Sequence, residues 1–181
     1  MFGLFKKKET PEEARALALY ELAVKQARIP SFYEDCNVPD SVDGRFEMIC
    51  LHAGLLIMRL EQLGEAGAKL AQALFDHMFL DMDRSLREMG ISDLRVPKHM
   101  KRMLNGFNGR AQAYKEAILA NDRKKLEAAI LRNIYGTIDD ADERDISHMA
   151  DYTQRQWRHV QMRGLQDFQN AENIFMKEGE T

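Results

Sequence analysis

The sequence has few of the residues that would assign it to a specialised structural class. Its two cysteines, Cys36 and Cys50, are too few for a disulfide framework and lack the spacing of a paired-cysteine zinc site, which favours a reducing compartment. No apolar run is long enough to cross a bilayer, and no cleavable signal peptide is expected. A net charge of −3 over 181 residues is too close to neutral for bulk binding of nucleic acid, so DNA is not expected as a partner.

The rest of the composition favours a folded helical protein. Apolar residues make up 45% of the chain and charged residues 30%, with only four prolines, and no stretch shows strand-like alternation. The length suits one domain with a real core. We therefore predict an all-α, single-domain bundle of about six helices over residues 11–176, between a flexible basic and apolar tail (1–10) and a short flexible tail (177–181).

Local signals predict where the helices begin and end. The stretch "TPEEARALALYELAVKQAR" opens with Thr10, Pro11 and Glu13, which predict a capping box and a helix start. A connection of about 15 residues follows it. Further helices are predicted over 45–63, 68–89, 97–120, 122–135 and 139–176, the last as one helix or as two broken near Gly164.

The helix predicted over 45–63 carries apolar side chains around nearly its whole circumference, which is typical of a central helix in a bundle. His52 and Arg59 are the polar exceptions and lie on one line of this helix. They either line a pocket or are satisfied internally, for example by Glu47 or by an acid on a neighbouring helix.

The segment "FDHMFLDMDRSLREMG" (75–90) combines an apolar stripe with a charged edge. The stripe is either core or a methionine-rich, adaptable binding surface, and it contains Phe75, Met78, Phe79, Met82, Leu86 and Met89. Beside it, Asp76, Leu80, Asp83 and Arg87 form an edge of the helix. This edge is either a solvated helix face or a surface that docks a partner.

The same segment is a poor candidate for catalysis. Asp76 and Asp83 are separated by a rise of about 10.5 Å along a helix, so they cannot share one metal ion. The chain has no Glu-x-x-His motif, no nucleophile elbow and no phosphate-binding glycine loop. We therefore expect a protein that is not an enzyme and that uses no catalytic residue, metal or cofactor. The alternative is a helical-bundle metalloenzyme that uses carboxylates and histidines.

Positive charge gathers in two places. Residues 98–132 contain nine bases and only three acids. This surplus either contacts anionic lipid head groups or ribosomal RNA, with Lys124 and Lys125 as contacts, or belongs to an ordinary charged helix pair. The opening "MFGLFKKK" is either a flexible tail or a weak membrane or ribosome contact, made by Phe2, Leu4, Phe5, Lys6, Lys7 and Lys8.

Three stretches in order, "ARIPSFYEDCNVPDSVDGRFEMICLH", "LAQALFDHMFLDMDRSLREMGISDLRVPKHMKRM" and "FNGRAQAY", resemble the ubiquinol–cytochrome c chaperone family. The resemblance runs from Ala14 to Tyr135. It implies an assembly factor that binds newly made cytochrome b and promotes assembly of the ubiquinol–cytochrome c reductase complex. It also implies work close to the ribosome and the inner membrane, with a small partner chaperone subunit in mitochondria. For this chain we expect a cytoplasmic place, peripherally associated with a bacterial inner membrane.

The resemblance also implies which residues carry the function. The positions that it carries over are Asp43, Gly44, Arg45, Phe46, Asp76, Asp83, Arg87, Glu88, Gly90, Gly109, Arg110 and Tyr114. Together with the apolar residues of segment 75–90, the expected partner-binding set is Arg45, Phe46, Asp76, Met78, Leu80, Met82, Asp83, Arg87, Glu88, Arg110 and Tyr114. We expect cytochrome b to bind in a concavity lined by methionine and leucine and to be oriented by the charged edge.

Overall fold

The computed structural model describes residues 10–176, which form eight helices and, within that range, no strand. Six helices have 11 residues or more, so the predicted all-α, single-domain bundle of about six helices is confirmed, with two short helices added. The elements are α1 (Pro11–Ala27), α2 (Ser31–Glu34), α3 (Val42–Leu60), α4 (Gly64–Glu88), α5 (Val96–Leu119), α6 (Arg123–Asn133), α7 (Glu143–Gln161) and α8 (Leu165–Asn170). None of these helices is both long enough and apolar enough to cross a membrane. The two predicted flexible tails lie outside the described residues, except for Thr10.

The predicted helix start at Thr10 is confirmed. The Thr10 hydroxyl accepts a hydrogen bond from the backbone N–H of Glu13 at 3.1 Å, and the Thr10 N–H donates to the Glu13 carboxylate at 2.7 Å. At the other end of the chain the predicted break is confirmed as two helices, because Gly164 caps α8 and donates its N–H to Asp167 Oδ2 at 2.8 Å.

Helix α4 begins earlier than predicted, at Gly64 and not near Ala68. Its first turn lies directly against the end of α3, because a Cβ on Gly67 would come within 2.3 Å of the Leu60 carbonyl oxygen. Only a residue without a side chain allows this approach. The early start is therefore a consequence of the contact between the two helices, which the local sequence signals do not contain.

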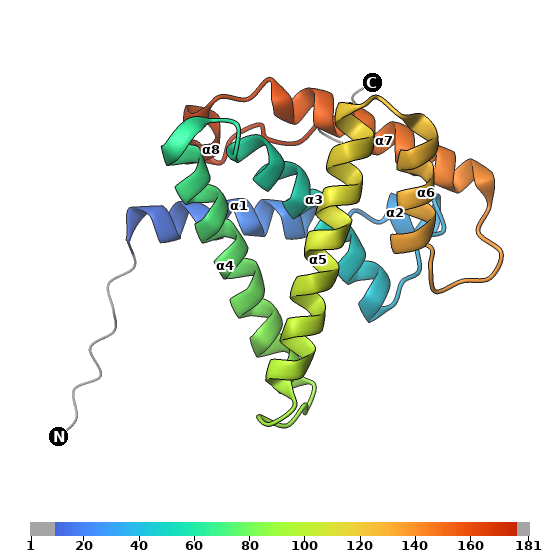
Figure 1. The fold of residues 1–181 in the computed structure, drawn as a ribbon, viewed down its shortest axis with the longest axis horizontal. Helices are drawn as coiled ribbons and strands as arrows, with labels where there is room; N and C mark the ends of the chain where they lie inside the picture. Colours follow the sequence, from blue (N-terminus) through green and yellow to red (C-terminus); the bar gives the residue numbers. More distant parts are fainter. Residues whose placement is uncertain (1–9, 177–181) are drawn as a thin grey trace.

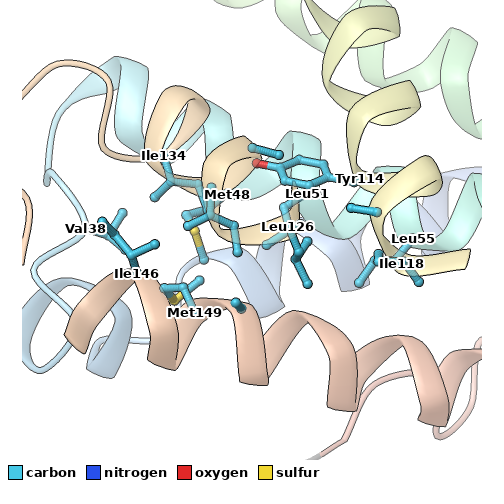
Figure 2. Packing of buried hydrophobic residues seen from close by; sticks show 14 of the residues in the cluster. Val38, Met48, Leu51, Leu55, Tyr114, Ile118, Leu126, Ile134, Ile146 and Met149 are labelled. Atoms are coloured by element: carbon cyan, nitrogen blue, oxygen red, sulfur yellow. The ribbon is translucent and has the colours of Figure 1, made fainter. Parts of the chain in front are cut away.

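Helix α3 lies among the other helices of the bundle (Figure 1). Its side chains belong to two hydrophobic cores, as its apolar circumference predicts. One face contributes Met48, Leu51 and Leu55 to the α7-side core, which also contains side chains of α5, α6 and α7 (Figure 2). The opposite face contributes Leu56 and Leu60 to the α4-side core, which contains side chains of α1, α4 and α8. Each core excludes water on a different side of the same helix.

Helices α4 and α5 form a long hairpin that projects from the rest of the molecule (Figure 1). Helix α4 has 25 residues, which corresponds to about 37 Å. It ends at Gly90, whose φ of +83° is typical of the glycine after a helix. The N–H of Ile91 then donates to the carbonyl of Leu86 at 3.0 Å, which closes the helix end and turns the chain toward α5.

Candidate functional site

An apolar groove lies between α3, α4 and α5. It has a volume of about 570 Å³, within the range of ligand-binding clefts. Its apolar lining includes Gly54, Ile57, Ala71, Phe75, Phe107 and Ala111. Small residues on all three helices leave this space unfilled, and we call it the α3–α4–α5 groove.

Aromatic and polar side chains border the groove. The rings of Phe75 and Phe107 pack edge to face with centroids 5.7 Å apart, and Phe79 stacks beside Phe75 at 4.5 Å. Both Lys115 on α5 and Glu61, which follows α3 directly, line the groove, and the Lys115 ammonium lies 3.2 Å from the Glu61 carboxylate. An apolar floor with a polar rim is the usual arrangement of a surface that binds a hydrophobic segment of another protein.

A largely buried ion pair joins α3 to α5. Arg110 Nε donates to Glu47 Oε2 at 2.5 Å and a second guanidinium nitrogen donates to the other carboxylate oxygen. Burial raises the pKa of the Glu47 carboxyl, and the adjacent guanidinium opposes that rise. The Arg110 guanidinium also lies over the Phe46 ring, 5.8 Å from its centroid. Arg110 therefore points toward α3 and holds the two helices together, and its role as a direct partner contact stays a prediction.

Three other predicted partner-binding residues are also buried. Met78 and Met82 belong to the α4-side core and Tyr114 belongs to the α7-side core. The buried stripe of α4 is centred on Leu74, Met78 and Met82, and Phe75 lies at its margin. The prediction that Met78 and Met82 line an open concavity is therefore wrong in this structure, because both side chains fill the space beneath α4.

The predicted charged edge of α4 does lie at the surface. The side chain of Leu80 is 59% exposed. Arg87 Nε donates to Asp83 Oδ2 at 2.6 Å, which lowers the pKa of the Asp83 carboxyl, and the guanidinium also pairs with Asp93. Asp76 accepts a hydrogen bond from Gln72 at 2.8 Å, while Glu88 is exposed.

Gln72 connects this edge to the groove. Its side chain lines the α3–α4–α5 groove on one side and, on the other, a hollow of about 460 Å³ between α4 and the first turn of α1. Asp76 and Leu80 line that second hollow. The surface of α4 thus offers a ridge with an apolar recess on one side and a charged recess on the other.

Arg45 and Phe46 lie at the start of α3, away from the groove residues of its C-terminal half. Arg45 is exposed, pairs with Asp40 at 2.5 Å and lies over the Tyr33 ring at 5.8 Å from its centroid. Phe46 is half-buried. The structure does not bring these two residues together with the α4 edge into one site.

His52 and Arg59 are satisfied internally, but not by an acid. His52 Nδ1 donates to the Met48 carbonyl at 2.8 Å, so its Nε2 accepts from the Tyr152 hydroxyl at 2.7 Å. Arg59 donates to the Arg163 carbonyl at 3.0 Å. Burial lowers the pKa of His52 to about 4, because the charged imidazolium is disfavoured away from water.

The described residues offer little for catalysis. Within residues 10–176 no group of three or more histidine, cysteine or acidic side chains could hold a metal ion. Cys36 and Cys50 are free and buried, and burial raises the pKa of each thiol, which disfavours the reactive thiolate.

The basic region from Lys98 to Arg132 is largely neutralised in its second half. Arg123 pairs with Glu127 and Asp151 and donates to Ser147, and Lys125 lies 3.5 Å from Asp122. Arg110 and Lys115 pair with acids of α3 and the turn after it. Lys124 and Lys125 are exposed, but acids from other elements offset much of the charge around them.

Comparisons with known proteins converge on one family. A family model described as ubiquinol-cytochrome C chaperone matches residues 34–175. Ubiquinol-cytochrome-c reductase complex assembly factor 1 of Xenopus laevis is 28% identical over 141 residues, which is 78% of this chain and 70% of that protein. The Mus musculus protein of that name is 26% identical over 161 residues, 89% of this chain but only 52% of its own length. The crystal structure of the Cbp3 homolog from Brucella abortus is 35% identical, with a TM-score of 0.83 over 96% of this chain and 95% of that one.

Proposed function

The chain belongs to the ubiquinol–cytochrome c chaperone family, and from this premise we propose that it is an assembly chaperone for the ubiquinol–cytochrome c reductase complex. The names of its relatives support this function. We propose further that its client is newly made cytochrome b, as the family resemblance implies. The protein binds this client and transforms no substrate.

The observation that carries the proposal is the α3–α4–α5 groove. A client destined for a membrane presents apolar side chains that need cover before assembly. A groove of about 570 Å³ with an apolar floor accommodates several such side chains. The ridge of α4, with Gln72 and Asp76 paired at 2.8 Å, then borders the bound segment. The exposed residues of the charged edge orient it, and Met78 and Met82 support the ridge from beneath.

A deletion strain tests the function, and variants of Gly54 test the groove. A Cβ on Gly54 would meet no atom within 4 Å, so leucine fits there without a backbone clash and projects into the groove. We expect the deletion to remove assembled complex, and the wild-type gene and Gly54→Ala to restore it. Gly54→Leu is expected to bind cytochrome b about tenfold or more weakly, since it occupies the apolar floor. Immunoblots of cytochrome b and haem spectra of the membranes measure the result.

The outcomes separate the function from its site. Normal assembled complex in the deletion strain would contradict the chaperone function. Full restoration of the assembled complex by Gly54→Leu would contradict the groove as the binding site, but not the chaperone function. Leucine and alanine both favour helix over glycine, so neither variant is expected to melt below the wild type. A melting curve of each variant checks that weaker binding by Gly54→Leu does not result from misfolding.

Reversal of the charged edge is a second test. Exchanging the two charges in Asp83→Arg with Arg87→Asp keeps an i,i+4 pair on the surface of α4 but inverts the field that a client meets. The exchange also breaks the exposed pair of Arg87 with Asp93, so we expect weaker capture of cytochrome b in a pull-down and a melting temperature lowered by at most about 4 °C. The matched control exchanges Glu21 and Lys25, an exposed acid and base four residues apart on α1 that line neither recess of α4. Equal capture by both variants would remove the edge from the proposed site.

Two other functions are less well supported by the structure. The metalloenzyme alternative needs a cluster of ligands, and residues 10–176 contain none. Binding of ribosomal RNA through Lys124 and Lys125 is weakened by the acids that pair with the neighbouring Arg123. Contacts with the ribosome, with a small partner subunit and with the inner membrane remain part of the proposal, and the last of these has a structural candidate.

A further inference from the structure

The end of the α4–α5 hairpin exposes two large apolar side chains. We call residues 89–102 the hairpin tip. Leu94 is 94% exposed and Met89 is 55% exposed, and both lie in or beside the turn between the two helices. Leu94 is the most exposed of the large hydrophobic side chains in residues 10–176. A single exposed leucine is common on protein surfaces, so its significance depends on the residues around it.

The hairpin tip is also positively charged, although the whole chain has a net charge of −3. It contains four bases and one acid. The acid, Asp93, pairs with Arg87 on α4. The four bases are exposed and, within the described residues, have no carboxylate within ion-pair distance: Arg95, Lys98, Lys101 and Arg102.

These bases occupy positions that stability alone disfavours. Lys98 and Lys101 lie in the first two turns of α5, where the helix dipole presents positive charge, and no acid is present in the first turn. Acids stabilise this end of a helix and bases destabilise it. Four exposed bases without a carboxylate partner in residues 10–176, all within eight residues of an exposed leucine, are therefore better explained by an anionic partner than by folding.

We propose that the hairpin tip docks the protein on the surface of an anionic lipid bilayer. Leu94 and Met89 enter the boundary between head groups and acyl chains, and the four bases contact lipid phosphates. The exposed leucine favours lipid over RNA, because an aliphatic side chain at the point of contact gains from burial in a bilayer and gains nothing from a phosphate backbone. The tip is the part of the hairpin farthest from the body (Figure 1). Phe75 in the groove precedes Met89, the residue that caps α4, by 14 positions, so the groove lies about 21 Å from the tip along the helix axis.

The test is co-sedimentation of the full chain with vesicles. We expect binding to vesicles of equal parts phosphatidylcholine and phosphatidylglycerol, weak binding to phosphatidylcholine alone, and release at high salt. The variant Lys98→Gln/Lys101→Gln/Arg102→Gln is expected to bind about a hundredfold more weakly, since each base near an anionic surface contributes about fivefold. Leu94→Ser is expected to lose about tenfold. The control Lys124→Gln/Lys125→Gln/Leu131→Ser changes the same residue types on α6 and is expected to bind like the wild type.

Each outcome decides the proposal. Wild-type binding by the tip variants, or loss of binding in the α6 control, would overturn it and assign the contact to another surface. Binding of a single-stranded RNA that depends on the tip bases, without binding to anionic vesicles, would overturn it in favour of nucleic acid. Circular dichroism of each variant checks that the exposed substitutions leave the helices intact. Because vesicle binding is measured without cytochrome b, its failure would leave the chaperone function unaffected.

Discussion

Glu47→Ala is expected to destabilise the protein by about 3 kcal/mol, because it leaves the half-buried Arg110 guanidinium without its partner. The carboxylate that it removes is 8% exposed, so water cannot replace it without opening the contact between α3 and α5. Urea unfolding followed by circular dichroism measures the free energy of unfolding. The same two helices form walls of the α3–α4–α5 groove, so client binding is expected to fall together with stability.

A double variant distinguishes the loss of the ion pair from the loss of side-chain packing. Glu47→Met with Arg110→Met replaces both charges with apolar side chains of similar length, and is expected to recover most of the stability that Glu47→Ala loses. The double-mutant cycle then gives the coupling between the two side chains. A loss below about 1 kcal/mol in the single variant would show that Arg110 finds water or another acceptor, contrary to the inward geometry.

Lowering the pH from 7 to about 4 is expected to decrease the free energy of unfolding by about 3 kcal/mol through the protonation of His52 alone. In the folded protein burial holds the pKa of His52 at about 4, whereas the unfolded value is 6.5. Between these two values the unfolded chain binds a proton that the folded chain does not. Stability is therefore complete above pH 6.5, falls as the pH decreases, and stops falling through this group below about pH 4. Urea unfolding at a series of pH values measures the slope.

The control removes both the His52 imidazole and the Tyr152 hydroxyl that donates a hydrogen bond to it. His52→Phe with Tyr152→Phe keeps rings in a cluster where His52 already packs against Phe32, Tyr152 and Phe175. The variant is expected to lose the slope between pH 6.5 and pH 4, whatever its stability at pH 7. A slope equal to that of the wild type would assign the proton uptake to other groups.

The sequence predicts well what is encoded locally. The capping box of Thr10 and Glu13 is confirmed because both partners lie within one turn. The central place of α3 follows from apolar side chains on all its faces, and the i,i+4 spacing predicts the pair of Asp83 and Arg87. The family is confirmed, because linked motifs in the right order are specific even where no single motif is.

The groove and the roles of the buried residues depend on how helices meet. Met78 and Phe75 lie on neighbouring lines of α4, and the positions of α1, α3 and α5 against this helix decide how deeply each is buried. The sequence around Arg110 does not reveal its ion-pair partner, because Glu47 lies 63 residues away. Gly54, Ala71 and Ala111 form a recess only because three helices bring small side chains together. Leu94 is not among the predicted contacts, although the sequence shows it as an apolar residue in a polar turn.

The position of α3 between the two cores has a consequence for how the molecule comes apart. If the α7-side core opens, Met48, Leu51 and Leu55 lose their cover, and the helix that they belong to is also the wall of the α4-side core. Neither half retains a complete interior without the other. The two halves therefore melt together in one cooperative transition, and the groove exists only while both are intact.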